Sequence, residues 1–451
     1  MWRAIDSAGR SRHAFPSKED RLPSLPRRSK ALPDAGGDHG PARPLPSWGT
    51  IWIRLSLALS VGFGVLLLPV PASALPSEKP DDTWHVNGPV RAIARYGNTI
   101  FLGGRFSQLR QKPMGVGGGK VRKVRNLAAI NANTGGPARG VDVPRFTGTG
   151  SIIYALTVAD GKLWIGGDFD AADGRNRTNI ASIHAGTGSL TGFSARVNRA
   201  VWALADNGSR VYAGGKFTTV RGQPRNRLAA FSPSGRLHAG WRPSANKKVS
   251  DMAVTPGKTG LFITGLFTSV SDPGGPSRPR NKIARLSTAT GKVHSWVAKN
   301  LTISSGVIGL GVNAIGDRVY WAVGGPDWVA ALNINTGARL WKTETDGTVN
   351  EAVEMGNRVI IGGHFLLVGR QPGGAGCDTQ PEACVRHVRL AALTMNGVLD
   401  QSWDPKLHGQ FGGVIEWEGA RRFLVDGDRL WVVGEFIEIT DVKQNYFGRL
   451  S

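Results

Sequence analysis

One pattern recurs seven times along the 451-residue chain and limits its fold more than any other feature. Each copy holds an alternating apolar strand, a second strand ending in Gly-Gly, a loop, a third strand introduced by Arg-Asn, and a Trp. The clearest copy, from Val201 to Pro243, reads VWALADNGSRVYAGGKFTTVRGQPRNRLAAFSPSGRLHAGWRP. The others begin at Val90, Ile153, Val249, Val312, Val349 and near Phe423. Apolar alternation with Gly or Asn-Gly at the turns is typical of short, half-buried strands.

Repeats that each supply one small sheet predict a closed array in which neighbouring sheets cover one another. We therefore predict an all-β fold, a seven-bladed β-propeller with four-stranded antiparallel blades. The chain ends favour closure, because the last copy stops at QNYFGRLS without a fourth strand, and DTWHVNGP supplies an orphan copy of that strand. We expect Trp84 to pair beside a final strand at 447–450, so that strands from both termini complete the last blade and remove its open edge.

Three recurring motifs are expected to be architectural. The Gly-Gly pairs let backbones approach closely or support a bulge at the strand end. The Arg-Asn pairs are expected to pack between blades and to fix a turn; they are Arg175-Asn176, Arg225-Asn226 and Arg280-Asn281. The recurring Trp residues are expected to pack between blades; they are Trp84, Trp241, Trp296, Trp341 and Trp403.

The elements VWALA, VYAGGKF, RNRLAAF, TG and WRP resemble the delta-60 type repeat of exported actinobacterial β-propeller proteins. The resemblance covers nearly all of residues 84–451. It implies a propeller and supplies no common set of catalytic residues. The fifth copy departs from the pattern, because Gly324-Gly325 runs straight into PDWVAALNINTGARLWKTETDG. That stretch is similar to the repeats of quinoprotein-type propellers, which keeps an enzymatic alternative open.

The chain before the repeats is expected to direct export. Residues 1–50 are rich in Arg, Pro and Ser and predict a disordered or misassigned extension. Residues 51–74 predict a signal peptide, in which Arg54 precedes an apolar run and a small-residue cleavage site ends at Ala74. An uncleaved signal anchor is the alternative. Residues 75–83 are expected to be a linker and 84–451 the propeller, secreted or associated with the cell wall.

The two cysteines, Cys377 and Cys384, lie close together in a Gly/Pro-rich insertion. In an exported protein such a pair predicts a disulfide that closes a local loop, and two free thiols are the alternative. The chain carries a formal net charge of +23, and residues 1–54 hold 10 basic and 5 acidic side chains, so the remainder keeps about +18. This excess predicts attraction to polyanions.

The long loops between second and third strands are expected on one face, where insertions usually mark the binding side. The predicted basic face comprises Arg110, Lys112, Lys120, Arg122, Lys123, Lys247, Lys248 and Arg278. Its Lys and Arg side chains would bind phosphate or carboxylate groups of a partner. The alternative is that these charged side chains only keep exposed loops hydrated. Trp328 and Trp417 are candidates for stacking on sugars, with burial as the alternative.

No residue set predicts catalysis, a cofactor or a metal. Asp168, Asp170 and Asp173 resemble a calcium loop, but their spacing does not match an EF-hand. Glu416 and Glu418 could serve a glycosidase, which needs two carboxylates, yet nothing distinguishes them. The sequence thus favours a non-catalytic, monomeric exported scaffold whose partner is an anionic wall polymer, polysaccharide or protein at the cell surface. It predicts no specific nucleic acid, and membrane contact only through the signal segment. The alternative is an enzyme acting in the central funnel on carbohydrate or with a quinone.

Overall fold

Short antiparallel strands separated by tight turns dominate the computed structural model, which describes residues 75–304, 306–374, 376–409 and 419–451. The all-β prediction is confirmed within these ranges, where the only helical element is the 3₁₀ turn η1 (Pro381–Ala383). No helix there has the length and hydropathy of a membrane span. The predicted extension (1–50) and signal peptide (51–74) lie outside the described residues.

Seven larger sheets are here called sheet 1 to sheet 7 in chain order. Each contains three neighbouring antiparallel strands, which we call its first, second and third strands. The first strands are β2 (Val90–Tyr96), β8 (Ile152–Ala159), β13 (Val201–Asp206), β19 (Val249–Val254), β24 (Ile308–Ile315), β28 (Val349–Met355) and β35 (Gly419–Asp426). The second strands are β3 (Thr99–Gly104), β9 (Lys162–Asp168), β14 (Val211–Gly215), β20 (Gly260–Gly265), β25 (Arg318–Gly324), β29 (Arg358–Gly363) and β36 (Arg429–Glu435). The third strands are β6 (Leu127–Asn131), β12 (Ile180–His184), β17 (Leu228–Phe231), β23 (Ile283–Ser287), β26 (Trp328–Asn333), β32 (Leu390–Thr394) and β39 (Phe447–Leu450).

The predicted fourth strand is present in only two of these sheets. Sheet 5 has β27 (Arg339–Glu344) and sheet 6 has β33 (Leu399–Asp400). Sheets 1 to 4 hold only single bridges in its place: Ile130 to Pro137, Ile183 to Leu190, Phe231 to Leu237 and Leu286 to Val293. The prediction of four strands per repeat therefore holds for sheets 5 and 6 and is corrected to three strands for the other sheets. In sheets 1 to 4 the chain bends or turns two residues after the bridge, which ends the pairing there.

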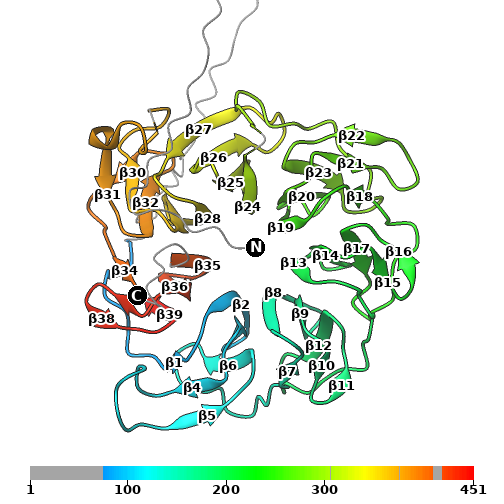
Figure 1. Cartoon of the computed structure of the whole chain (residues 1–451), viewed down its shortest axis with the longest axis horizontal. Helices are drawn as coiled ribbons and strands as arrows, with labels where there is room; N and C mark the ends of the chain where they lie inside the picture. The colour runs from blue at the N-terminus through cyan, green and yellow to red at the C-terminus, as the bar shows by residue number, and fades with distance from the viewer. Residues whose placement is uncertain (1–74, 305, 375, 410–418) are drawn as a thin grey trace, which may run out of the picture. The chain divides into compact units, whose positions relative to one another are not determined.

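The first strands lie nearest the centre of Figure 1, and each contacts the first strand of the next sheet. The series of contacts runs β2, β8, β13, β19, β24, β28, β35 and returns to β2. Seven hydrophobic clusters fill the spaces between neighbouring sheets, each with residues from two of them. Phe101 of sheet 1 shares a cluster with Ile153 of sheet 2, and Trp431 of sheet 7 shares one with Ile100 of sheet 1. Apolar side chains buried between the facing surfaces of neighbouring sheets thus hold the sheets together.

Smaller sheets accompany all the larger ones except sheet 5. In each, the segment just before a first strand pairs with the loop between the second and third strands of the same sheet. In sheets 3 and 6 that segment pairs through a single bridge, Val197 to Val220 and Thr345 to Val368. The strands are β1 (His85–Val86), β4 (Gln108–Arg110) and β5 (Val121–Lys123); β7 (Phe146–Thr147), β10 (Ala171–Ala172) and β11 (Arg175–Asn176); β15 (Thr219–Val220) and β16 (Gln223–Pro224); β18 (Ser244–Ala245), β21 (Ser269–Ser271) and β22 (Ser277–Pro279); β30 (Leu367–Gly369) and β31 (Cys384–Arg386); β34 (Leu407–His408), β37 (Glu438–Ile439) and β38 (Val442–Lys443). Sheet 5 is the one whose sequence lacks the loop and the Arg-Asn pair.

The Arg of the Arg-Asn motif holds the chain that follows the third strand. Arg225 donates to the carbonyl of His238 at 3.2 Å, and Arg280 donates to that of His294 at 2.7 Å. In sheet 2 this role belongs to Arg177, which reaches the carbonyl of Thr191 at 3.0 Å. The motif there is therefore shifted by two residues from the predicted Arg175-Asn176, which is exposed.

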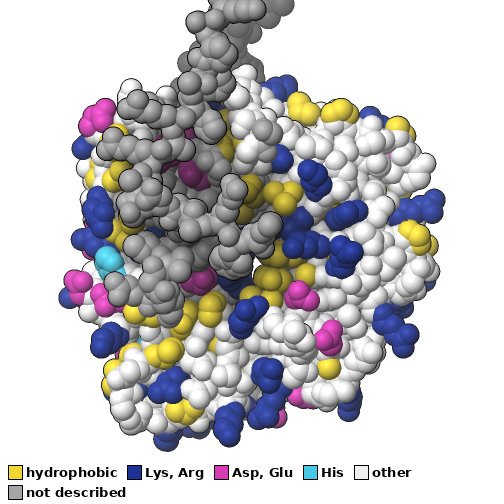
Figure 2. Space-filling view, in the orientation of Figure 1, with side chains coloured by type: hydrophobic (Ala, Val, Ile, Leu, Met, Phe, Trp, Pro, Cys, Tyr) yellow, Lys and Arg dark blue, Asp and Glu magenta, His cyan; other side chains and the backbone are white. Residues whose placement is uncertain are grey.

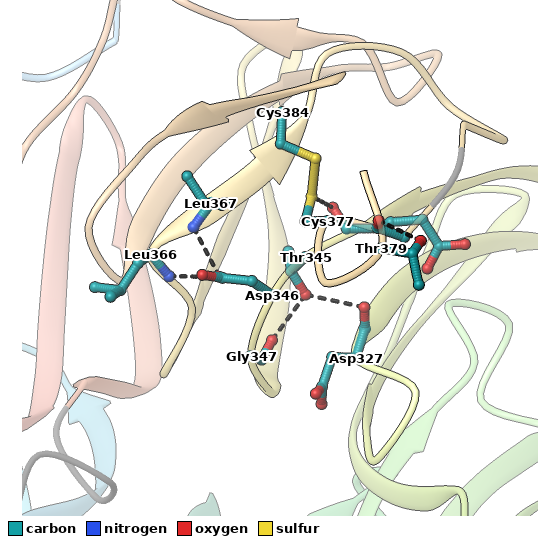
Figure 3. Close-up of a disulfide and its surroundings, with 11 residues drawn as sticks. Asp327, Thr345, Asp346, Gly347, Leu366, Leu367, Cys377, Thr379 and Cys384 are labelled. Atoms are coloured by element: carbon teal, nitrogen blue, oxygen red, sulfur yellow. Dashed lines mark hydrogen bonds between the residues drawn. A yellow bond between two sulfur atoms is a disulfide. The ribbon is translucent and has the colours of Figure 1, made fainter. Parts of the chain in front are cut away.

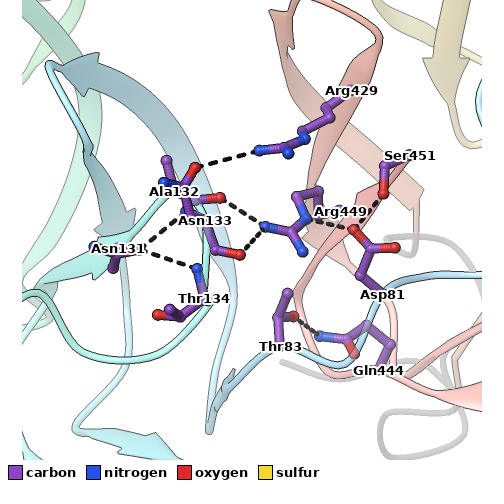
Figure 4. A network of polar contacts seen from close by, with 10 residues as sticks. All are labelled: Asp81, Thr83, Asn131, Ala132, Asn133, Thr134, Arg429, Gln444, Arg449 and Ser451. Carbon is purple, nitrogen blue, oxygen red and sulfur yellow. Dashed lines mark hydrogen bonds and ion pairs between the residues drawn. The ribbon is translucent and has the colours of Figure 1, made fainter.

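The first described residues of the chain lie beside its last strand, in sheet 7 (Figure 4). The N–H groups of Ser77 and Asp81 donate to the carbonyls of Ser451, at 3.1 Å, and Arg449, at 2.8 Å. The segment expected to be a linker thus lies against the last strand, and Asp81 rather than Trp84 pairs there. The N–H of Trp84 instead donates to the carbonyl of Gly135, beyond β6. Pairing of both termini occurs, three residues earlier than predicted.

The recurring Trp residues connect neighbouring sheets as expected. In four of the five, all but Trp84, the indole N–H donates to a backbone carbonyl at or just beyond the third strand of the next sheet, or to the terminal segment. The pairs are Trp241 with Ser287 at 3.2 Å, Trp296 with Asn333 at 3.2 Å, Trp341 with Met395 at 2.9 Å, and Trp403 with Pro76 at 2.7 Å. Pro76 takes the place of a carbonyl that sheet 7 lacks, because its third strand ends the chain.

The disulfide between Cys377 and Cys384 is confirmed. It closes the insertion between β30 and β31, and both cysteines are buried. Figure 3 shows the sulfur atoms beside the chain that links sheets 5 and 6, where Asp346 accepts N–H bonds from Leu366 and Leu367, both at 2.7 Å. The insertion is thereby tied to the body of the fold.

Candidate anion-binding site

Every first strand carries a β-bulge at the same place in its pairing with the second strand. In sheet 1, for example, Val90 opposes Gly104 and Ala92 opposes Gly103, which leaves Arg91 without a partner. The unpaired residues are Arg91, Tyr154, Trp202, Ser250, Leu310, Asn350 and Arg421. We call these seven the bulge ring. A bulge re-aims its side chain, and the predicted role of the Gly-Gly pair at a bulge fits this pairing.

The bulge ring lines one cavity. Lys248 and Arg422 complete the lining. The cavity measures about 90 Å³, counted as the space open to the centres of water molecules. Seven separate sheets thus each contribute one side chain to a single site.

An aromatic pair with a lysine forms one side of the cavity. The rings of Tyr154 and Trp202 stack with centroids 4.1 Å apart and planes at 11°. The Nζ atom of Lys248 lies 4.0 Å from the centroid of the Trp202 ring, and that of Lys216 lies 5.5 Å away. Burial, with the nearby charge of Lys216, lowers the pKa of Lys248 to about 8. A lysine in this setting gains from a neighbouring anion.

Two arginines occupy the other side. Arg91 and Arg421 both form ion pairs with Glu435, whose side chain is 12% exposed. Arg421 also donates to Oδ1 of Asn350 at 3.1 Å. Burial, followed by the charge of Arg91, lowers the pKa of Arg421 to about 10. One carboxylate therefore serves two guanidinium groups, which leaves this side of the cavity positive.

Four polar atoms of the bulge ring are buried without a hydrogen-bond partner among the described residues. They are Nε of Arg91, Nε1 of Trp202, Oγ of Ser250 and Nε of Arg421. Most buried polar groups in proteins have a partner, and an orphan of this kind indicates a ligand or water. Three of the four can only donate, so the missing partner is an acceptor.

A second cavity, of about 160 Å³, adjoins the first, since both are lined by Tyr154, Trp202 and Arg422. Arg422 forms an ion pair with Asp251 at 3.2 Å, and Glu351 accepts the N–H of Phe423 at 2.6 Å. Burial raises the pKa values of both carboxyl groups, that of Glu351 to about 7. The equivalent positions in four other sheets are small, Ala92, Ala155, Ala203 and Gly311. Asp251, Glu351 and Arg422 lie in the space that these small residues leave open.

The predicted basic face falls into three groups. Lys248 lines the cavity, and Lys247 beside it is exposed. Five residues lie on or between β4 and β5: Arg110, Lys112, Lys120, Arg122 and Lys123. Arg122 pairs with Asp142 at 3.1 Å, and Arg278 of β22 pairs with Asp272 at 2.8 Å. Figure 2 shows basic side chains beside a hollow that hydrophobic side chains also line.

Trp328 does not lie at a surface, which corrects its proposed stacking role. It is 2% exposed, and its ring packs edge-on against Trp321 at 5.2 Å between centroids. The calcium-like loop is used locally, since Asp173 accepts the backbone N–H of Arg145 at 2.7 Å. No three His, Cys, Asp or Glu of the described ranges gather as a metal site would require. Trp417, Glu416 and Glu418 lie outside the described residues.

Sequence reasoning predicted none of the seven bulge residues as site residues, and placed Arg91, Tyr154 and Trp202 within the strands of the repeat. The signal is the second position of each copy, which varies while the first stays mostly apolar, as in VRAIA, IYALT and VWALA. In sheets 5 and 7 the first position is Gly309 and Ala420. Because Gly and Ala do not stand out as the start of an apolar strand, the predicted copies begin three residues too late, at Val312 and near Phe423.

Comparisons with known proteins add little to this geometry. No protein-family model matches the chain, and no curated protein does. Among solved structures, the chain is similar to the computationally designed protein Ika8, at 12% identity and a TM-score of 0.46, over 81% of this chain and 92% of that one. A similarity at this level carries no argument about fold or function.

Proposed function

We propose that the chain is an exported seven-bladed β-propeller, related to proteins with the delta-60 type repeat, that binds anionic polymers and is not an enzyme. The closed series of contacts between first strands supports the propeller, because a linear array would leave β2 and β35 apart. The disulfide supports export, since structural disulfides persist in oxidising compartments. The signal peptide remains the proposed route.

The observation that carries the binding function is the set of basic side chains that line the cavity of the bulge ring. Arg91, Arg421 and Lys248 line the cavity, while the β4–β5 loop adds exposed lysines. Wall polymers, acidic polysaccharides and acidic protein surfaces carry the phosphate or carboxylate groups that such residues bind. The same charge would speed encounter with a polyanion at low salt.

Retention on a carboxylated polysaccharide matrix tests this function. We expect the purified protein to elute at a salt concentration that falls when Lys112, Lys120 and Lys123 are changed together to Gln, because exposed charge contacts are screened by salt. The matched control changes three other exposed basic residues to Gln: Arg236 and Lys292, in the connections after third strands, and Arg339, at the start of β27. Equal loss of retention in both variants would mean that net charge alone, rather than this face, is responsible.

A carbohydrate-degrading enzyme is the second candidate, because Asp251 and Glu351 converge on one cavity. A carboxyl with a pKa of about 7 beside another acid is the combination that glycosidases use. The contacts favour a structural role instead, since Asp251 is paired with Arg422 and accepts the N–H of Val312 at 3.0 Å. Release of reducing ends from acidic polysaccharides, abolished by Glu351→Gln, would favour the enzyme.

A further inference from the structure

Within the proposed function, on which this inference rests, the cavity has features of a subsite for one unit of the polymer. Two of its three arginines, Arg91 and Arg421, share a single carboxylate, Glu435, and its lysine has no acidic partner among the described ion pairs. An added anion would therefore be stabilised by charges already in place. We propose that the cavity binds a single carboxylate-bearing sugar unit.

The positions of the donors match a carboxylate. Following the order of the sheets around the series of contacts, Arg91 and Arg421 are neighbours, while Trp202 and Ser250 are neighbours on the far side. A carboxylate accepts about four hydrogen bonds, and the buried Nε atoms of Arg91 and Arg421 have no hydrogen-bond partner among the described residues. Charge-assisted bonds of this kind are the strong ones.

The remaining lining fits a sugar better than a bare anion. Tyr154, Trp202 and Leu310 give the cavity an apolar wall, while Ser250 and Asn350 offer polar groups for hydroxyls. Its volume of about 90 Å³ is roughly six to eight times what one water needs by the same measure, which suits a sugar ring. Inorganic phosphate would leave the apolar wall without a partner, and a neutral sugar would leave the charges without one.

Calorimetric titration of the purified full-length protein with glucuronate tests the proposal, with glucose and inorganic phosphate as comparison ligands. We expect saturable binding of glucuronate that weakens as salt rises, and much weaker binding of glucose. Lys248→Met keeps the aliphatic stem and should weaken glucuronate binding at least tenfold, as expected for the loss of one charged contact. The matched control, Lys292→Met in the exposed connection after β23, should bind as the unaltered protein does.

Three results would overturn the proposal: equal affinity for glucose and glucuronate, phosphate binding at least as tight as glucuronate, or unchanged glucuronate affinity in Lys248→Met. A second variant, Ser250→Ala, guards against a folding defect, because it removes one hydroxyl and should also weaken binding while the thermal midpoint stays near that of the unaltered protein. Retention on the polyanionic matrix separates the two proposals. Retention without glucuronate binding refutes the subsite alone, and loss of both refutes the binding function.

Discussion

Arg449 connects three parts of the chain, and its substitution tests whether the termini fasten sheet 7 to sheet 1. Its guanidinium pairs with Asp81 of the terminal segment and donates to the carbonyls of Ala132, at 2.6 Å, and Asn133, at 2.8 Å, beyond β6 (Figure 4). The change Arg449→Met keeps the aliphatic stem and removes these three contacts together with the guanidinium that lies over the Trp431 ring, 5.5 Å from its centroid. We expect it to lower the free energy of unfolding substantially.

The magnitude follows from the burial of these groups. The side chains of Arg449 and Asp81 are 12% and 26% exposed, so their ion pair is largely sheltered from water. Hydrogen bonds to charged groups contribute about 1.5–3 kcal/mol each, and the freed carbonyls regain water, so the sum is not additive. We expect a loss of about 2–4 kcal/mol. Arg429→Met is the matched control, because Arg429 makes one exposed contact to Asn133 at 3.4 Å, and it should cost at most about 0.5 kcal/mol.

Urea unfolding of both variants, with Asp81→Asn and the double variant, measures these terms. We expect a coupling energy between Arg449 and Asp81 of about 1–2 kcal/mol in the double-mutant cycle. The reasoning is refuted if Arg449→Met and Arg429→Met lose the same small free energy, or if the cycle shows no coupling. Either result would mean that the termini lie beside each other without stabilising the closure.

Three further changes probe other parts of the fold. Trp341→Phe removes the indole bond to Met395, and thermal unfolding should show a loss of about 1 kcal/mol plus a smaller packing term. Reducing the bond between Cys377 and Cys384, which encloses a short loop, should cost about 2–2.5 kcal/mol in urea unfolding, whereas an unchanged midpoint would show that the insertion opens independently. Since burial raises the pKa of Glu351 from 4.5 to about 7, stability should fall as pH rises between these values and then level off; Glu351→Gln should reduce that fall and leave the part due to Asp251, as unfolding across this pH range can verify.

The sequence was informative about strands and turns because these are encoded locally. Alternation of apolar residues and Gly-marked turns indicated the first three strands of every sheet, and the deviation of the fifth copy coincides with the missing small sheet at sheet 5. The prediction was wrong where strand pairing depends on segments that are far apart in the sequence. Whether the outer segment forms a fourth strand or a single bridge, and whether Asp81 or Trp84 meets the last strand, depends on how the closed set of sheets packs.

The candidate site was harder to predict than the fold, for a reason that the β-bulges explain. The paired residues on either side of each bulge are constrained by packing between sheets: a Cβ on Gly103 would lie 2.5 Å from Ile153, and one on Gly166 would lie 2.7 Å from Val201. Such positions must repeat, and repetition is what sequence analysis detects. The bulge residue escapes this constraint, because it leaves the ladder.

It follows that variation and the proposed binding role coincide at the bulge ring. Seven structurally equivalent positions hold Arg, Tyr, Trp, Ser, Leu, Asn and Arg, while the residue before each is apolar or Gly. If these side chains only filled space, one apolar type would serve at most positions, as small residues do one step further along four of the strands. The unlike set instead places donors and an aromatic wall around one volume, with three cations among the nine lining residues beyond the buried Arg422. A scaffold whose repeats specify the frame can thus change its ligand by substitutions at seven positions without disturbing the packing between its sheets.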